Sequence, residues 1–416
     1  MPNKLPQGWV ECQLGEVFEI VTGKTPPKKY PEYFNGDIPF VKPGDLDKEI
    51  YITQTKDDSL TAEGLKNAPN LPKNTVLVSC IGNLGKKAIL GITGSCNQQI
   101  NAIIPNDYIE SKYTYFYIDK IVLWLEKNAS ATTVKILNKG KFEQAPFLLP
   151  PLNEQKRIVE KIESEFAKID EGLEHLENAK EQIKQYRQSV LKSALEGKLY
   201  KSTEWEETTL GQIIKPRRER ISPNDNNGNM VFIGMDCIEP NSLHIHKQYR
   251  LKETKSVSFV FFKKDVLYGR MRSYLNKVWE ATFDGAASAE FIVFPENQSI
   301  ISSYLKYLLH QQDFVKYATR NASGDRPRVK FESDLSDYKF YLPTIKEQKR
   351  IVEEIEKRFA VADEVEKVVE QNIEKSKQLK QSILKKAFEG RLVPQDPTDE
   401  PASTLLEKIK QERSKK

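Results

Sequence analysis

The chain has 416 residues, of which 38% are hydrophobic and 10% aromatic, so it is long enough for two to four domains with packed cores. No run of about 18 apolar residues occurs, and Met1–Trp9 lacks the apolar core of a secretory signal, so neither a transmembrane helix nor secretion is expected. The formal net charge of +5 is too small to indicate a nucleic-acid partner. The four isolated cysteines predict a reduced, cytoplasmic protein.

Residues 1–150 contain short apolar segments with turn residues between them, which predict a mixed α/β block rich in strands. Examples are Asp37–Val41, Thr75–Gly82 and Ile100–Pro105. All 17 basic residues of this block are lysines, and they are nearly balanced by 16 acidic residues. Any affinity of the block for DNA must therefore come from local patches rather than from a global positive field.

Residues 151–200 predict a long amphipathic helix. From Val159 to Ala194, mainly apolar residues recur at alternating steps of three and four, which is the pattern of a coiled-coil seam. A proline pair, Pro150–Pro151, precedes the helix, and Gly197 fits a left-handed cap at its end. At 1.5 Å per residue the helix would be ~65 Å long.

Residues 201–342 repeat the plan of the first block. Val231–Met235 and Glu290–Pro295 are predicted strands, and Trp205 stands where Trp9 stands in the first block. Asn128–Ser130 and Asn321–Ser323 share the sequence Asn-Ala-Ser at an offset of 193 residues, and a basic–aliphatic pair follows each, Lys135–Ile136 and Arg328–Val329. Unlike the first block, the second contains clusters of arginine.

Residues 343–392 duplicate the first helix. The hexapeptide EQKRIV begins at Glu154 and again at Glu347, and this offset of 193 residues continues without gaps to the two final glycines, Gly197 and Gly390. Such a duplication indicates that the chain is built twice from one plan. Thr344 and Glu347 predict a capping box at the start of the second helix.

The two helices are expected to bury their seams on each other in an antiparallel pair, because a block joins the end of one helix to the start of the other. The alternative is that the helices associate between chains. Three polar seam positions of the second helix, Glu366, Ser376 and Lys380, set the register or face a third helix. The apolar seam residues are Ile162, Phe166, Ile169, Leu173, Leu176, Ile183, Ile355, Phe359, Val369, Ile373 and Ile383.

The tail, residues 393–416, carries a short helix. Its residues Leu405, Leu406 and Ile409 stand at helical spacing and form a small apolar face. Nothing obvious in the sequence covers that face, so it is a candidate contact for a partner protein.

The order of elements resembles the specificity subunit of type I restriction–modification enzymes. Each block is followed by a proline-led EQKRIV helix ending in ALEGKL or AFEGRL, and the chain closes on a VPQDP…DEPAS tail. The resemblance implies an α+β fold: two mixed α/β target-recognition domains separated by two long helices that form an antiparallel coiled coil. It covers nearly the whole chain.

The same resemblance implies a function. Each recognition domain would read one half of a split, asymmetric sequence in double-stranded DNA. The coiled coil would set the spacing of the halves and dock two methyltransferase subunits, and a motor–nuclease subunit can join. The chain itself would carry no cofactor, since S-adenosylmethionine and ATP are expected on the partner subunits only.

The motifs of an independent enzyme are missing. The nearest strings to an adenine methyltransferase motif, Thr25–Lys28 and Leu149–Leu152, lack the polar and aromatic groups that hold a flipped base. No glycine-rich nucleotide loop occurs. His244 and His246 would need further ligands to bind a metal, and the acidic run Gly44–Glu49 is typical of caps and turns. The sequence therefore predicts a non-catalytic protein without metal.

In protein–DNA complexes, lysine, arginine and backbone amides bind phosphates, and arginine, asparagine, glutamine or lysine bind base edges. Arg270, Arg272 and Tyr274 would face one way if they lay on a strand. The alternative for each basic residue is a solvated charged face, and Ser95–Gln99 could instead be a buried strand with satisfied amides. The candidate DNA contacts are Asn83, Lys86, Lys87, Gln98, Gln99, Lys135, Arg217, Arg218, Arg270, Arg272, Tyr274, Arg326 and Arg328.

A different class of function fits part of the pattern. A coiled-coil scaffold could join two protein-binding modules without touching DNA.

The first block has no arginine, which bears on the bases that it could read. Either lysine contacts guanine there, or the half-site of this block is adenine-rich.

Overall fold

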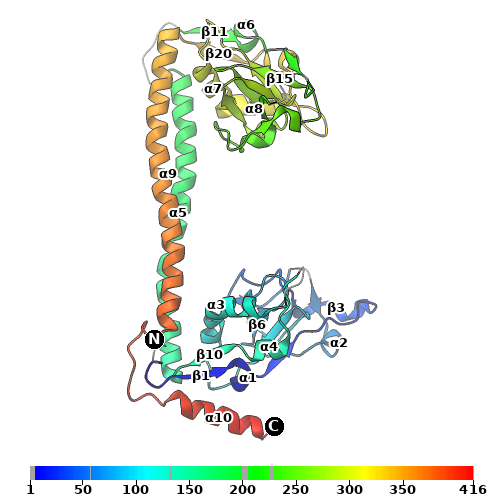
Figure 1. Ribbon diagram of the computed structural model, residues 1–416, viewed down its shortest axis with the longest axis vertical. Coiled ribbons are helices and arrows are strands. Elements are labelled where there is room, and N and C mark those ends of the chain that lie inside the picture. The colour runs from blue at the N-terminus through cyan, green and yellow to red at the C-terminus, as the bar shows by residue number, and fades with distance from the viewer. Residues whose placement is uncertain (1–4, 57, 131–133, 199–204, 225–228, 416) are drawn as a thin grey trace. The chain divides into compact units, whose positions relative to one another are not determined.

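The structure is a computed structural model that describes residues 5–56, 58–130, 134–198, 205–224 and 229–415 (Figure 1). The chain divides into two compact units. One unit comprises Met1–His175 together with Ile373–Lys416, and the other comprises Leu176–Asn372. Each unit therefore combines one globular block with the adjoining parts of two long helices.

The two long helices, α5 (Leu152–Leu195) and α9 (Ile345–Ala387), run antiparallel, as predicted (Figure 1). In one unit, Arg187 of α5 donates to Glu366 of α9 at 2.8 Å. In the other, Lys380 of α9 forms an ion pair with Asp170 of α5. Two of the polar seam positions are thus used in bonds between the helices, and these bonds fix the register of the pair.

The predicted seam lies inside the chain. Ile162, Ile183, Ile355, Val369 and Ile383 are buried, and the other six seam residues are half-buried. Part of the seam also contacts the blocks: the rings of Phe166 and Phe116 meet edge to face at 5.9 Å. Because the seam is covered within one chain, it is not free to join two chains.

The helix ends follow local rules. Thr344 Oγ1 accepts a hydrogen bond from the Glu347 N–H at 3.4 Å, and the Thr344 N–H donates to the Glu347 carboxylate at 3.3 Å, so the predicted capping box is present. Gly197 and Gly390 have φ values of +74° and +66°. This left-handed conformation ends a helix and favours glycine, as predicted for both positions.

A buried glutamine explains part of the repeated hexapeptide. Gln155 is fully buried; its Oε1 accepts from the Glu110 N–H at 2.9 Å and its Nε2 donates to the Pro150 carbonyl at 3.0 Å. Gln348 repeats this arrangement in the other unit. In both units the side chain joins the proline-led start of a long helix to the start of a helix in the block.

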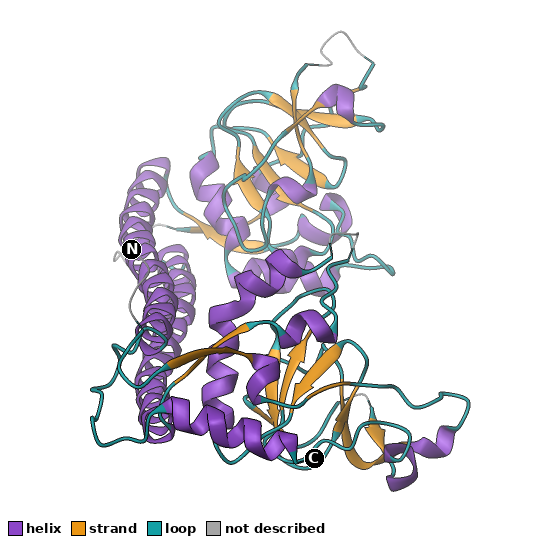
Figure 2. Ribbon diagram, turned by 60° about the horizontal axis from the view of Figure 1, so that its bottom comes forward, coloured by secondary structure: helices purple, strands orange, loops and turns teal. Residues whose placement is uncertain are grey.

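The first block is a set of small sheets covered by helices (Figure 2). Its main sheet has the order β2-β9-β6-β7-β4, in which β6 pairs antiparallel with both neighbours, and a smaller sheet has the order β5-β3-β8. The elements are β1 Val10–Gln13, α1 Leu14–Val17, β2 Ile20–Thr22, β3 Phe34–Val41, β4 Tyr51–Ile52, β5 Ser59–Leu60, α2 Ala62–Leu65, β6 Val76–Ser79, β7 Lys87–Leu90, β8 Ser95–Cys96, β9 Ile100–Ile103, α3 Ser111–Asn128, α4 Lys139–Glu143 and β10 Pro146–Leu149.

The second block has a related plan. In it β16 pairs antiparallel with β17 and β19, as β6 does with β7 and β9, and a further sheet has the order β12-β15-β18-β13-β14. The elements are β11 Glu206–Thr209, α6 Leu210–Ile213, β12 Arg220–Ile221, β13 Val231–Ile233, β14 Tyr249–Arg250, β15 Ser258–Phe261, β16 Val266–Gly269, β17 Val278–Glu280, β18 Gly285–Ala287, β19 Phe291–Phe294, α7 Ser302–His310, α8 Gln312–Asn321 and β20 Lys339–Leu342. The prediction of two mixed α/β blocks is confirmed.

Each block is closed at its base by its own first and last strands. β1 pairs antiparallel with β10, and β11 pairs antiparallel with β20. A tryptophan next to each first strand packs against the glycine at a helix end. A Cβ atom added to Gly197 would lie 3.3 Å from the Trp205 ring, and one added to Gly390 would lie 3.6 Å from the Trp9 ring. Entry and exit of each block are therefore adjacent, which suits a module that is inserted as a unit.

The tail packs on the first block, which corrects the expectation that its apolar face is uncovered. Leu405 and Ile409 of α10 (Ala402–Ser414) are buried in the core of that unit, and Leu406 packs against it. Tyr108 donates a hydrogen bond to Glu412 at 2.6 Å. The sequence did not reveal this contact because α10 packs on α1 and on the loop at Tyr108, which lie about 300 residues or more from the tail in sequence. The last residue, Lys416, lies outside the described residues.

Candidate DNA interface

A loop at the end of the middle strand is built in the same way in both blocks. Its backbone is held by one pair of hydrogen bonds to the segment that follows α3 or α8. The matched bonds, each from an N–H to a carbonyl, are Gly82 to Lys135 (2.9 Å) and Leu137 to Cys80 (2.9 Å) in the first block, and Arg272 to Pro327 (2.7 Å) and Val329 to Arg270 (3.0 Å) in the second. The two loops therefore occupy equivalent places.

A third segment joins these two in each block. The Cys80 N–H donates to the Gln99 carbonyl at 2.8 Å, and the Arg270 N–H donates to the Glu290 carbonyl at 2.9 Å. Three segments that are distant in sequence thus meet at one place in each block. Most of the predicted DNA contacts lie on them: Asn83, Lys86, Gln98, Gln99 and Lys135 in the first block, and Arg270, Arg272, Tyr274, Arg326 and Arg328 in the second.

These bonds correct one detail of the predicted correspondence. Ile136 bridges Ile81, and Arg328 bridges Met271 in the same position, so Arg328 corresponds to Ile136 and not to Lys135. The second segment is one residue shorter after its Asn-Ala-Ser string, which the sequence offset alone did not reveal.

The prediction that Arg270, Arg272 and Tyr274 alternate along a strand is wrong. Strand β16 ends at Gly269, Arg272 is left-handed with a φ of +53°, and Ser273–Leu275 forms a 3-10 turn. The first block has Gly82, with a φ of +77°, at the place of Arg272. A non-glycine residue in this conformation costs roughly 1 kcal/mol or more, so the loop geometry constrains an exposed arginine.

The guanidinium of Arg328 donates two hydrogen bonds to the carboxylate of Glu290, which lies on the neighbouring segment. Its Nε lies 2.9 Å from Glu290 Oε2, and its Nη2 lies 2.8 Å from Oε1. The Arg328 guanidinium, through these bonds, holds the pKa of the Glu290 carboxyl below its usual value, and the charge of Arg270 adds to the effect. Glu290 was not among the predicted site residues.

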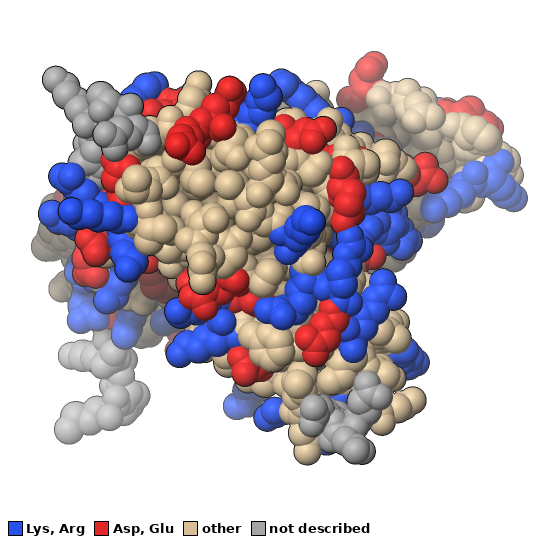
Figure 3. All heavy atoms as spheres, turned by 90° about the horizontal axis from the view of Figure 1, so that it is seen from above, with Lys and Arg blue, Asp and Glu red and all other residues tan. Residues whose placement is uncertain are grey.

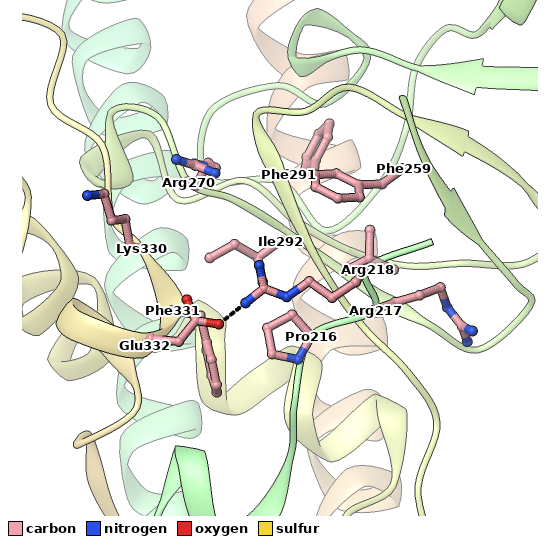
Figure 4. Close-up of a pocket in the computed structure, with 11 residues that line it drawn as sticks. Pro216, Arg217, Arg218, Phe259, Arg270, Phe291, Ile292, Lys330, Phe331 and Glu332 are labelled. Carbon is pink, nitrogen blue, oxygen red and sulfur yellow. Dashed lines mark hydrogen bonds and ion pairs between the residues drawn. The ribbon is translucent and has the colours of Figure 1, made fainter. Parts of the chain in front are cut away.

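A cavity of about 240 Å³ adjoins this site in the second block (Figure 4). Arg270 and Lys330 line one side of it, and aromatic side chains line others, including Phe291 and Phe331. The Nε of Arg270 is buried without a hydrogen-bond partner among the described residues. Lys330 was also missed from the sequence, although it lies only two residues after the predicted Arg328.

Two predicted arginines are engaged elsewhere. Arg217 donates from Nε to the buried carboxylate of Asp265 at 2.8 Å, and its guanidinium lies over the Phe262 ring. We expect it to support the block rather than to contact DNA. Arg218 lies across the cavity and pairs with Glu332 (Figure 4).

The candidates of the first block are also divided. Asn83 and Gln98 are exposed. Lys135 is exposed and pairs with Glu126 at 3.0 Å. Lys87 is buried, and burial lowers the pKa of its ammonium, which pairs with Asp119 of α3. We expect Lys87 to fix β7 to α3.

The amides of Ser95–Gln99 are partly structural. Ser95–Cys96 forms β8, and the buried Asn97 donates from Nδ2 to Gln99 Oε1 at 3.0 Å. Thr25 donates to the exposed Gln98 at 2.7 Å. The segment thus combines the two alternatives, a buried strand and an exposed amide.

Charge is mixed over the surface. On the face drawn in Figure 3, Lys and Arg side chains are interspersed with Asp and Glu and surround uncharged areas. A local cluster, rather than the net charge of +5, must therefore provide any affinity for DNA. Within the described ranges, no three His, Cys, Asp or Glu side chains gather into a metal site, and no helix is long and apolar enough to cross a membrane.

Comparison with known proteins decides the family. The family model "Type I restriction modification DNA specificity domain" matches residues 6–185 and 202–375. The chain belongs to this family. It is the DNA specificity subunit of a type I restriction–modification system. The two matched segments correspond to the two blocks, each with most of the helix that follows it.

Relatives and solved structures agree over nearly the full length. The chain is 27% identical to the type I restriction enzyme EcoDI specificity subunit of Escherichia coli, over 99% of this chain and 97% of the relative. A chain from a solved structure titled for complex assembly and conformational transition of the type I R-M system matches with a TM-score of 0.74, 20% identity and coverage of 94% and 100%. The HsdS subunit of Thermoanaerobacter tengcongensis matches with a TM-score of 0.56, 20% identity and coverage of 94% and 99%. At this identity, the two structures show the shared fold alone.

Family membership also settles the chemistry of the chain. The specificity subunit is not itself an enzyme. The S-adenosylmethionine and ATP of such a system belong to the methyltransferase and restriction subunits.

Proposed function

We propose that each block is a target-recognition domain that reads one half of a bipartite, asymmetric sequence in double-stranded DNA. The observation that carries this proposal is the convergence of the same three segments in both blocks, with side chains of the base-reading and phosphate-binding types on them. The domains are residues 1–150 and 201–342; the spacers are residues 151–200 and 343–392, and the tail is residues 393–416.

The antiparallel coiled coil sets the spacing of the two half-sites and docks two methyltransferase subunits. Equivalent positions of the two helices expose a large hydrophobic side chain, which supports a partner that binds twice. These are Tyr186 and Leu379, which stand at the 193-residue offset and are 43% and 51% exposed. A motor–nuclease subunit can join this assembly, which we place in the cytoplasm.

Binding of the chain, assembled with its methyltransferase, to duplex DNA should depend steeply on salt. Raising monovalent salt from about 50 to 200 mM is expected to weaken binding by at least about 100-fold, because each neutralised phosphate releases counterions. An electrophoretic shift series at several salt concentrations measures this. A scaffold of two protein-binding modules would give no shift at any salt concentration.

Lengthening a helix should change the spacing and leave the half-sites intact. Four residues inserted between Leu195 and Gly197 add about one turn, ~6 Å, which corresponds to one or two base pairs along the duplex. Sequencing of methylated sites is expected to show both half-sites retained around a longer spacer. Full methylation at the original spacing would instead indicate a flexible tether.

A further inference from the structure

The bonds between Glu290 and Arg328 use only one edge of the guanidinium. Glu290 Oε2 accepts from Nε at 2.9 Å, and Oε1 accepts from Nη2 at 2.8 Å. Among the described residues, Nη1 of Arg328 has no hydrogen-bond partner, and the side chain is 40% exposed. The edge formed by Nη1 and Nη2 therefore still offers donors, in an orientation that the carboxylate fixes.

The carboxylate is itself held in place. Glu290 comes from the segment before β19, and its carbonyl accepts the Arg270 N–H at 2.9 Å. Its side chain is only 27% exposed. Arg328 lies on the segment that follows α8, in a bridge with Met271 of the loop. Each partner is thus attached to the three-segment junction by backbone hydrogen bonds.

We propose that Glu290 is a positioning residue that holds Arg328 so that its free Nη1–Nη2 edge reads a guanine in the second half-site. A guanine presents two acceptors, O6 and N7, in the major groove, and a planar arginine fork matches them. An arginine that is fixed before binding loses less conformational entropy than a mobile one. This inference rests on the proposed function of the second block.

The first block offers a natural contrast. At the places of Glu290 and Arg328 it has Gln99 and Ile136, and Gln99 Oε1 accepts from Asn97 instead. An amide and an aliphatic side chain cannot form a charged fork. We therefore expect the guanine contact at this place to occur in the second half-site only.

The test uses the chain assembled with its methyltransferase and duplexes that carry the target found by sequencing methylated sites. Each base pair of the second half-site is replaced in turn, and the affinity is measured for each duplex. With the wild-type chain, replacing the guanine should weaken binding about 5- to 150-fold. Glu290→Gln should reduce the preference at that one position to within about threefold, because a glutamine amide can accept from only one of the two N–H groups and no longer fixes the arginine fork.

Controls separate positioning from charge and from folding. Glu290→Gln removes a negative charge, so its affinity for unrelated DNA should not fall. Glu296→Gln removes a similar charge from the Lys264 pair of the same block, away from the three-segment junction, and should leave the base preference intact. Arg328→Lys keeps the positive charge but lacks the guanidinium fork, so it should reduce the guanine preference at the same base pair. This variant tests the inference even if the Glu290→Gln chain folds poorly.

The outcomes are distinct. Loss of affinity of the Glu290→Gln assembly for every duplex alike, with the guanine preference retained, would mean a structural role and overturn the inference. A second half-site without a G·C pair would overturn it as well. If the wild-type assembly binds all duplexes equally, the proposed function of the block fails and the inference fails with it.

Discussion

Replacing Gln348 with alanine should lower the free energy of unfolding by about 3–5 kcal/mol. Gln348 is fully buried; its Oε1 accepts from the Ile301 N–H at 2.9 Å, and its Nε2 donates to the Ser299 and Pro343 carbonyls at 3.0 and 2.9 Å. Alanine would leave these three backbone groups without their partner and would create a cavity. Unsatisfied buried groups cost about 1–3 kcal/mol each, with partial relief if water enters.

The measurement is thermal unfolding of the full chain. For a unit of this size we expect the transition that reports on Leu176–Asn372 to fall by about 10 °C. Gln371→Ala, at an exposed position of the same helix, is the matched control and should shift the transition by no more than about 2 °C. If the Gln348→Ala variant unfolds at the same temperature as the Gln371→Ala control, the buried amide is not needed to join helix and block.

Substituting both Tyr186 and Leu379 with glutamate should abolish assembly with the methyltransferase. The two residues are exposed, apolar and equivalent in the duplicated helices, so each is expected to contribute to one docking surface. A charge buried without a partner in an interface costs several kcal/mol. Either single substitution should leave one methyltransferase bound and lose the other.

Size-exclusion chromatography with light scattering measures the stoichiometry. The matched control, Gln185→Glu with Gln378→Glu, adds the same charges at neighbouring duplicated and exposed positions and should assemble normally. Normal assembly of the Tyr186 and Leu379 variant would place docking on another face of the helices.

The long helices were predictable because their signals are local. A seam at steps of three and four, a proline-led start and a terminal glycine each depend on neighbouring residues, and α5 and α9 end within a few residues of the predicted limits. The buried Gln155 and Gln348 were visible only as part of a repeated string. Their role depends on backbone groups of the blocks, such as the Glu110 and Ile301 N–H groups about 45 residues away.

The loops after β6 and β16 were less predictable because hydrogen bonds to distant segments set their path. Arg270 and Arg272 look like alternating strand positions until the bonds to Val329 and Pro327, more than 50 residues later, bend the chain away from β16. Glu290 looks like any solvated acid until the fold brings it to Arg328. Lys87 has the sequence context of an exposed lysine, and only α3, with Asp119, buries it. For α10 the helix was visible in the sequence, whereas the surface that covers it was not.

Exchange of the second block tests the central claim most directly. The strand pair β11–β20 closes this block at its base, so residues 201–342 can be replaced as a unit by the corresponding block of a related specificity subunit. The exchanged chain is expressed with its methyltransferase, and the methylated sites of the host genome are sequenced. We predict that one half of the recognised sequence changes while the other half and the spacer are retained. A change in both halves, or in neither, would contradict independent reading by the two blocks.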